Sequence, residues 1–127
     1  MKKKTVVTSE EVLIVTADSI LAEIIAERFS DFDISVRVVT KYDKALDILD
    51  DKIPRAIVVD YDVPKENCFE FLGKSYKKHD SLCIALLASF LSFDDVKHAR
   101  KTGVDFVYIK HHYHPVDMVQ AIVRATS

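Results

Sequence analysis

The most constraining feature of the sequence is a fivefold alternation of short apolar runs with segments of helical periodicity. The apolar runs are rich in β-branched side chains and span residues 12–15, 34–39, 56–59, 82–87 and 106–109. Their apolar character is continuous rather than alternating, which is typical of parallel strands covered on both faces. A segment with apolar residues at helical spacing follows each run, such as Ile20, Leu21, Ile24, Ile25 and Phe29 after the first.

Local signals at the ends of these helical segments support the same division of the chain. Asp18 or Ser19 suits the N-cap of the first helix. The fourth begins at Ser92, with an acidic residue three positions later as in a capping box, and it ends before Gly103. Pro115 suits the first turn of the fifth helix.

Strict alternation of strand and helix predicts an α/β fold with three α/β/α layers, doubly wound around a five-stranded parallel sheet. Five such units are typical of the flavodoxin-like strand order 2-1-3-4-5. We expect residues 12–127 to form this domain and residues 1–11 to form an N-terminal tail. In such a sheet the functional crevice lies at the carboxyl ends of the strands, so the residues after each run are the first candidates for chemistry.

The charge and hydrophobicity of the chain exclude several function classes. A net charge of −2 gives no general electrostatic attraction to nucleic acid or acidic lipid. No apolar run approaches the roughly 18–20 residues that a membrane span requires. The basic start is followed by a stretch too short and polar for a secretory signal. We therefore expect a cytoplasmic protein that binds neither nucleic acid nor membranes directly.

Two ionisable residues and a proline lie at the predicted crevice in a recognisable arrangement. Asp60 follows the third run, with Pro64 four positions on, and Lys110 follows the fifth run behind a Gly-x-Asp-Phe motif. Over residues 12–126 the chain in this respect resembles the receiver domain of bacterial two-component response regulators, the CheY-like superfamily. The resemblance implies that Asp60 is a phospho-acceptor and that Lys110 contacts the acyl phosphate.

The chain departs from the receiver pattern at the positions that support this chemistry. The resemblance implies an acid pair for Mg²⁺ after the first run, where Thr16 and Ala17 stand. Ala88 and Val107 occupy the hydroxyl and aromatic positions that respond to phosphorylation. His111 occupies the position of the proline that follows the lysine in the receiver pattern. A cis peptide bond before a residue other than proline costs about 2.5–4 kcal/mol, so we expect a trans bond and a reshaped loop at His111.

The loss of the acid pair predicts a low affinity for Mg²⁺, because one Asp60 carboxylate rarely holds this strongly hydrated ion. Asp18 and Asp62 are weak additional ligand candidates, and Asp18 is better explained as a helix cap. Ser89 is a poor substitute for the missing hydroxyl, since adjacent strand residues point to opposite faces. We expect no cofactor, with Mg²⁺ only if the phosphorylation site still works. Without a working phosphorylation site, Asp60 and Lys110 are explained as a structural ion pair.

Three imidazoles follow the fifth run, on His111, His112 and His114. Such a group could bind zinc or nickel or respond to pH, although no fourth metal ligand has a suitable spacing. A solvated loop is the plainer interpretation.

Aromatic residues gather around the fourth helical segment and the fifth apolar run. In receiver-like domains the face formed by the fourth helix, fifth strand and fifth helix is the usual site of dimerisation and effector docking. Aromatic rings are enriched in such interfaces, and they are equally common in cores. The candidates for this interaction face are Phe93, Phe106, Tyr108 and Tyr113, with Phe90 beside them.

These observations predict a receiver-like domain of bacterial two-component (phosphorelay) signal transduction that is not an enzyme. We expect a phosphorylation-independent interaction or dimerisation module that binds a protein partner or a second copy through the aromatic face. A histidine kinase is a further candidate partner. Two alternatives stay open: a working phospho-acceptor modified on Asp60, and a metal- or pH-responsive sensor that uses His111, His112 and His114.

Overall fold

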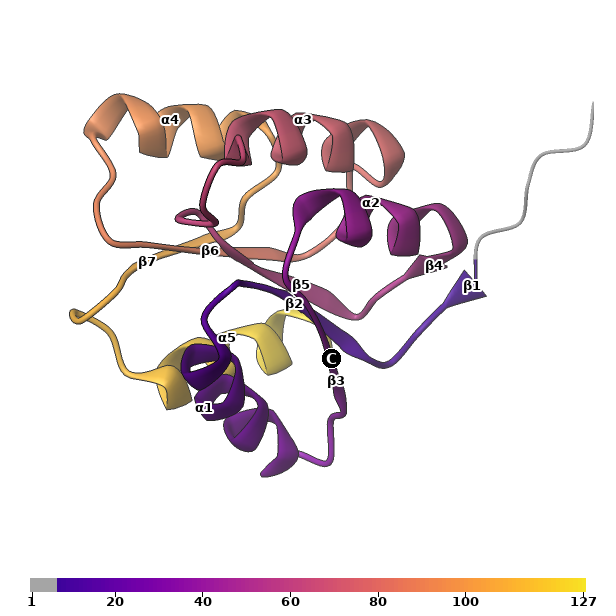
Figure 1. Cartoon of the computed structure of the whole chain (residues 1–127). Helices are drawn as coiled ribbons and strands as arrows, with labels where there is room; N and C mark the ends of the chain where they lie inside the picture. Colours follow the sequence, from indigo (N-terminus) through magenta and orange to yellow (C-terminus); the bar gives the residue numbers. More distant parts are fainter. Residues whose placement is uncertain (1–6) are drawn as a thin grey trace, which may run out of the picture.

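The computed structural model describes residues 7–127 and has the three-layer α/β/α architecture that the sequence predicts (Figure 1). Five parallel strands form the central sheet in the order β3-β2-β5-β6-β7. Numbered within this sheet alone, the order is 2-1-3-4-5, so the predicted fold class is confirmed. The strands are β2 Val12–Val15, β3 Val36–Val39, β5 Ala56–Asp60, β6 Ile84–Ala88 and β7 Phe106–Ile109.

Five helices cover the two faces of this sheet within the described residues (Figure 1). Helices α1 (Ser19–Ser30) and α5 (Pro115–Ala125) pack on one face. Helices α2 (Tyr42–Asp51), α3 (Cys68–Lys78) and α4 (Phe93–Lys101) pack on the other. No helix in residues 7–127 is long and apolar enough to cross a membrane.

Strand β5 illustrates why the apolar runs are continuous rather than alternating. Ile57 and Val59 contribute to the core beneath α2, α3 and α4, whereas Ala56 and Val58 contribute to the core beneath α1 and α5. All four residues are at most 1% exposed. Since successive side chains point to opposite faces, a strand buried on both faces needs an apolar residue at every position.

The helix ends confirm the local signals in the sequence. The side chain of Asp18 caps α1, and Ser92 and Asp95 form a capping box at the start of α4. Gly103 follows α4 with a φ of 88°, the left-handed conformation that glycine adopts without strain. Pro115 occupies the first turn of α5, as predicted.

Two short strands outside the central sheet involve part of the predicted tail. Strand β1 (Val7–Thr8) pairs in parallel with β4 (Lys52–Ile53), and the N–H of Ser9 donates to the carbonyl of Ile53 at 2.8 Å. Residues 7–9 of the predicted tail over residues 1–11 thus pair with β4, while residues 1–6 lie outside the described residues. Two-residue strands are too short for periodicity to reveal them.

Candidate functional site

The carboxyl end of β5 carries Asp60, which is 4% exposed. Its Oδ1 accepts hydrogen bonds from Lys110 Nζ at 2.7 Å and from the backbone N–H of Asp62 at 2.8 Å. Its Oδ2 accepts a hydrogen bond from the Thr16 hydroxyl at 2.7 Å. Both oxygens of this buried carboxylate therefore have partners, and one partner is a cation.

Thr16 and Ala17, the positions at which the sequence predicts a lost acid pair, directly follow β2. Thr16 is 2% exposed, and the parallel pairing of β2 with β5 brings it beside Asp60. Its Oγ1 also accepts a hydrogen bond from the backbone N–H of Asp18 at 3.1 Å. Ala17 is exposed and offers no polar side-chain atom. Of these two residues, the one beside Asp60 is thus a neutral hydrogen-bond donor.

Asp18, a weak candidate for a metal ligand, is engaged by the first helix. Its Oδ1 accepts hydrogen bonds from the backbone N–H groups of Ile20 and Leu21, each at 3.1 Å. These bonds satisfy two of the free donors at the start of α1. The carboxylate therefore acts as the N-cap that the sequence predicts.

Lys110 follows β7 and forms ion pairs with two carboxylates. Its Nζ lies 2.7 Å from Asp60 Oδ1 and 3.2 Å from Asp62 Oδ2, and its side chain is 16% exposed. Burial lowers the pKa of Lys110, but the hydrogen bonds and charges of Asp60 and Asp62 outweigh burial and leave the pKa above its usual value. Lys110 therefore stays positively charged in the folded protein.

Asp62 lies in the loop after β5 and reaches across to the end of β6. Its Oδ2 accepts a hydrogen bond from the backbone N–H of Ser89 at 2.8 Å, in addition to the contact with Lys110. Burial raises the pKa of Asp62, but the hydrogen bonds from Ser89 and the charge of Lys110 prevail, so the pKa lies below its usual value. The Asp62 carboxylate is therefore held as an anion between β6 and β7.

The two predicted switch positions, Ala88 and Val107, lie at the end of β6 and within β7. Ala88 is fully buried, and its carbonyl accepts a hydrogen bond from the backbone N–H of Lys110 at 2.8 Å. Val107 is half-buried and packs on the core beneath α2, α3 and α4. Neither side chain carries a hydroxyl or an aromatic ring, so neither can make the contacts that the receiver pattern implies.

The histidine loop leads from Lys110 into α5. No cis peptide bond occurs in residues 7–127, so the predicted trans bond at His111 is confirmed, and His111 has a left-handed φ of 71°. His112 is exposed, and His114 is the N-cap residue of α5 without a side-chain capping bond. Across the described part of the chain, no group of three or more His, Cys, Asp or Glu residues is placed to hold a metal ion.

Tyr42 is a site residue that sequence reasoning missed. Its hydroxyl donates to the backbone carbonyl of Asp60 at 2.5 Å, and its ring stacks on Phe71 with a centroid separation of 4.8 Å. Burial raises the pKa of Tyr42, so the hydroxyl keeps its proton. No spacing in the sequence indicates this contact, because Tyr42 begins α2 and reaches Asp60 only through the packing of α2 on the sheet.

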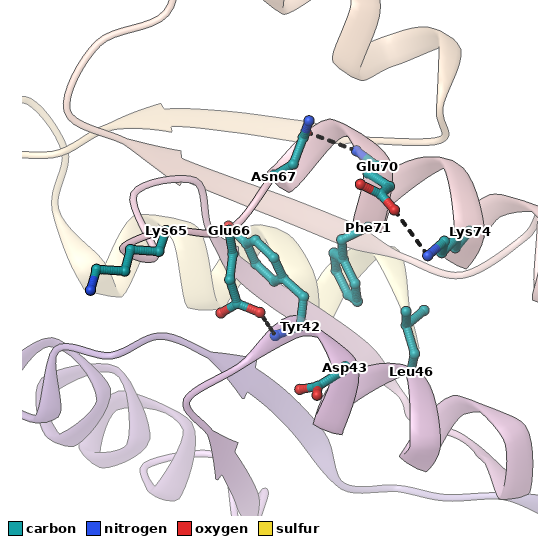
Figure 2. Close-up of a pocket in the computed structure, with 9 residues that line it drawn as sticks. All are labelled: Tyr42, Asp43, Leu46, Lys65, Glu66, Asn67, Glu70, Phe71 and Lys74. Atoms are coloured by element: carbon teal, nitrogen blue, oxygen red, sulfur yellow. Dashed lines mark hydrogen bonds and ion pairs between the residues drawn. The ribbon is translucent and has the colours of Figure 1, made fainter.

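Tyr42 and Phe71 also border a shallow groove of about 350 Å³ between α2, the loop after β5 and α3 (Figure 2). Its charged side chains are mostly used within the protein. Glu66 accepts a hydrogen bond from the backbone N–H of Tyr42 at 3.2 Å, and Glu70 pairs with Lys74 at 3.1 Å. These contacts of the lining side chains are therefore contacts within the protein, between α2, α3 and the loop before α3.

The predicted interaction face separates into an exposed part and a packed part. Phe93 is 78% exposed at the start of α4, and Phe90 in the preceding loop is 74% exposed. Phe106, Tyr108 and Tyr113 instead pack on the core beneath α1 and α5. The exposed aromatic surface thus lies on α4 and the loop before it rather than on β7.

Comparison with known proteins identifies the fold. No protein-family model and no curated protein matches the sequence. The structure is similar to a CheY-like receiver domain from Methanospirillum hungatei JF-1, with a TM-score of 0.84 and 16% identity over 92% of this chain and 93% of that chain. HP1043, an orphan response regulator of H. pylori, gives a TM-score of 0.82 and 18% identity over 94% and 98% of the two chains.

A third similar structure is the receiver domain of the Francisella response regulator 1452. It gives a TM-score of 0.78 and 20% identity over 94% of this chain and all of that chain. The chain therefore has the fold of a response-regulator receiver domain.

Proposed function

We propose that this chain is a receiver-like domain of two-component signalling that works in the cytoplasm by binding protein and not by catalysis. Its activity does not depend on phosphorylation of Asp60. The receiver fold supports the signalling class. The observation that carries phosphorylation independence is the hydrogen bond from the Thr16 hydroxyl to Asp60 Oδ2, at 2.7 Å.

The chemistry of phosphoryl transfer explains why this bond matters. A carboxylate and a phosphoryl group are both anions, so their approach needs a divalent cation that neutralises the oxygens. Thr16 supplies a hydrogen bond to Asp60 but no negative charge that attracts such a cation. The donor set around Asp60 therefore suits a buried ion pair with Lys110 better than a catalytic phosphate acceptor.

The other carboxylates near the crevice do not replace the missing acid pair. Asp18 caps α1, and Asp62 binds the Ser89 N–H and Lys110. Mg²⁺ prefers octahedral oxygen ligands and gives up its water reluctantly. Recruiting either carboxylate would take an acceptor away from backbone N–H groups, so the residues present fit Mg²⁺ poorly.

The exposed rings of Phe90 and Phe93 support a role in binding. Both are large aromatic side chains more than 70% exposed, and Lys97 Nζ lies 5.3 Å from the centroid of the Phe93 ring. Aromatic residues are enriched where proteins meet proteins. We assign this surface to a protein partner or to a second copy of the chain.

Phosphorylation on Asp60 is a second candidate function, and one observation favours it. Asp60 and Lys110 remain together at the carboxyl edge of the sheet, with Nζ and Oδ1 2.7 Å apart. Intact mass after incubation with acetyl phosphate and Mg²⁺ separates the two functions. We expect no mass increase for the wild type or for the Asp60→Asn control. A stoichiometric phosphoryl adduct on the wild type alone would favour the second function.

Binding through the aromatic surface is tested separately. Light scattering over a range of concentrations measures self-association, and Phe93→Ser removes the most exposed ring. If a second copy is the partner, the wild type should associate and the variant should be shifted toward monomer. Glu23→Ser, at an exposed position on α1, is the matched control and should leave the association unchanged.

A further inference from the structure

Strand β3 is an edge of the central sheet, and within residues 7–127 no strand pairs with its outer side. On the inner side, the carbonyl of Val39 accepts a hydrogen bond from the N–H of Thr16 at 3.0 Å. In a parallel ladder, alternate residues direct their backbone groups to the same side. The N–H and carbonyl groups of Val36 and Val38 therefore point away from β2.

The side chains of β3 do not protect this edge. Edge strands commonly carry a charged residue or a proline that opposes pairing with another chain. The two residues with outward backbone groups are Val36 and Val38, and Val38 is 43% exposed. Arg37 lies on the α2 face, because Val39 on the same side of the strand packs on the core beneath α2. The edge is therefore open to a further strand.

Helix α2 lies beside this edge and presents charged side chains toward it. The opposite side of α2 faces α3 across the groove of Figure 2. On the side toward β3, Asp47 and Ile48 border a shallow groove of about 200 Å³ together with Arg37. Lys44 is exposed one turn before Ile48 and therefore lies on this side too. Neither Lys44 nor Asp47 has an ion-pair partner in the described part of the chain.

We propose that the outer edge of β3 and the adjoining side of α2 bind a second copy of this chain, with the two β3 strands antiparallel. The pairing joins two five-stranded sheets into one continuous sheet. This surface goes beyond the proposed function, because β3 is the sheet edge opposite β7 and the surface does not include Phe90 or Phe93.

Charge complementarity identifies a second copy as the occupant. Lys44 lies toward the start of α2, and Asp47 lies about one turn nearer its end. A two-fold axis reverses the direction of α2 in the second copy, so Lys44 of each copy faces Asp47 of the other. An axis through Val38 also places Arg37 opposite Val39 of the second copy, which avoids two like charges directly opposite each other.

Sedimentation of the full chain over a range of concentrations tests the charges, and the wild type should associate as the concentration rises. Lys44→Glu or Asp47→Lys alone should weaken association by about tenfold or more, because each creates two like-charge contacts across the two-fold axis. The double variant exchanges the charges and should associate within about threefold of the wild type. Lys77→Glu, an equal charge change at an exposed position on α3, and Phe93→Ser should leave this association unchanged.

Hydrogen exchange tests the backbone pairing. The amides of Val36 and Val38 should exchange about tenfold more slowly, or slower still, in concentrated than in dilute wild-type protein. The amides of Arg37 and Val39, which face β2, are the internal control. Val38→Pro removes an outward donor, and because an edge strand tolerates proline there, the variant should fold without associating. The charge exchange decides the question even if Val38→Pro folds poorly.

Three outcomes would overturn the inference. A wild type that stays monomeric at every concentration would mean that no second copy covers the edge, which leaves it to a strand of another protein. A double variant that associates as weakly as Lys44→Glu would mean that Lys44 does not face Asp47. Association that is lost in Phe93→Ser and unchanged in Lys44→Glu would assign self-association to the aromatic surface of the proposed function instead.

Discussion

The ion pair between Lys110 and Asp60 gives the sharpest prediction about stability. Lys110→Met keeps most of the side-chain volume but removes the positive charge that compensates the carboxylate of Asp60, a residue that is only 4% exposed. Removing one partner of a buried ion pair costs about 3–5 kcal/mol. Asp60 keeps hydrogen bonds from the Thr16 hydroxyl and the Asp62 N–H, and Lys110 is 16% exposed. We therefore expect a loss of about 2–3 kcal/mol in the free energy of unfolding.

A second substitution in the same background tests the cause. Asp60→Asn removes the uncompensated charge, so the double variant should be more stable than Lys110→Met alone, by about 1–2 kcal/mol. Urea denaturation at constant m-value measures the free energy of unfolding of the single variant, the double variant and a control variant. Lys77→Met, at an exposed position on α3, is the control and should change stability by less than about 0.5 kcal/mol. If Lys110→Met matches this control, or if Asp60→Asn gives no rescue, the assignment of a buried charge pair is wrong.

Three further changes test other parts of the structure. Thr16→Val deprives Asp60 Oδ2 of its donor and should cost about 2–3 kcal/mol in urea denaturation, whereas Thr16→Ser should cost less than about 1 kcal/mol; equal losses would contradict the hydrogen bond. Gly103→Ala should cost about 1–3 kcal/mol, measured as a lower Tm, because φ is 88° and the new Cβ lies 2.9 Å from the Tyr76 ring. The lowered pKa of Asp62 means that its stabilising contribution is present above pH 3.8 and is lost as the pH falls below this value. The wild type should therefore lose stability more steeply than Asp62→Asn on acidification in that range, and parallel pH curves would refute the assignment.

The sequence predicts the bounds of two strands of the central sheet correctly. The bounds of β2 and β7 agree with the prediction. The predicted strand over residues 34–39 begins too early, because Ile34 belongs to the turn that closes α1. Its N–H donates to the carbonyl of Phe29, and Asp33 adopts a φ of 58°. This is a Schellman motif, in which a buried apolar residue closes a helix and can be mistaken for the start of a strand.

The candidate site was predictable where it depends on strand order. Asp60 ends β5 and Lys110 follows β7. The carboxyl ends of both strands lie at one edge of the sheet, so the proximity of the two residues follows from the topology. The bond from Thr16 to Asp60 and the contact of Asp62 with Ser89 were not predicted. Both depend on side-chain rotamers and loop conformations, for which the sequence carries no periodic signal.

The hydroxyl of Tyr42 gives this protein an intrinsic optical reporter. The chain has five tyrosines and no tryptophan, so its near-ultraviolet absorbance is dominated by phenol groups. Burial raises the pKa of Tyr42 above that of an exposed phenol, and the hydroxyl donates its proton in a hydrogen bond to the Asp60 carbonyl. On alkaline titration the last tyrosinate signal should therefore appear only when α2 separates from β5. A spectrophotometer alone can then follow the opening of the structure behind Asp60.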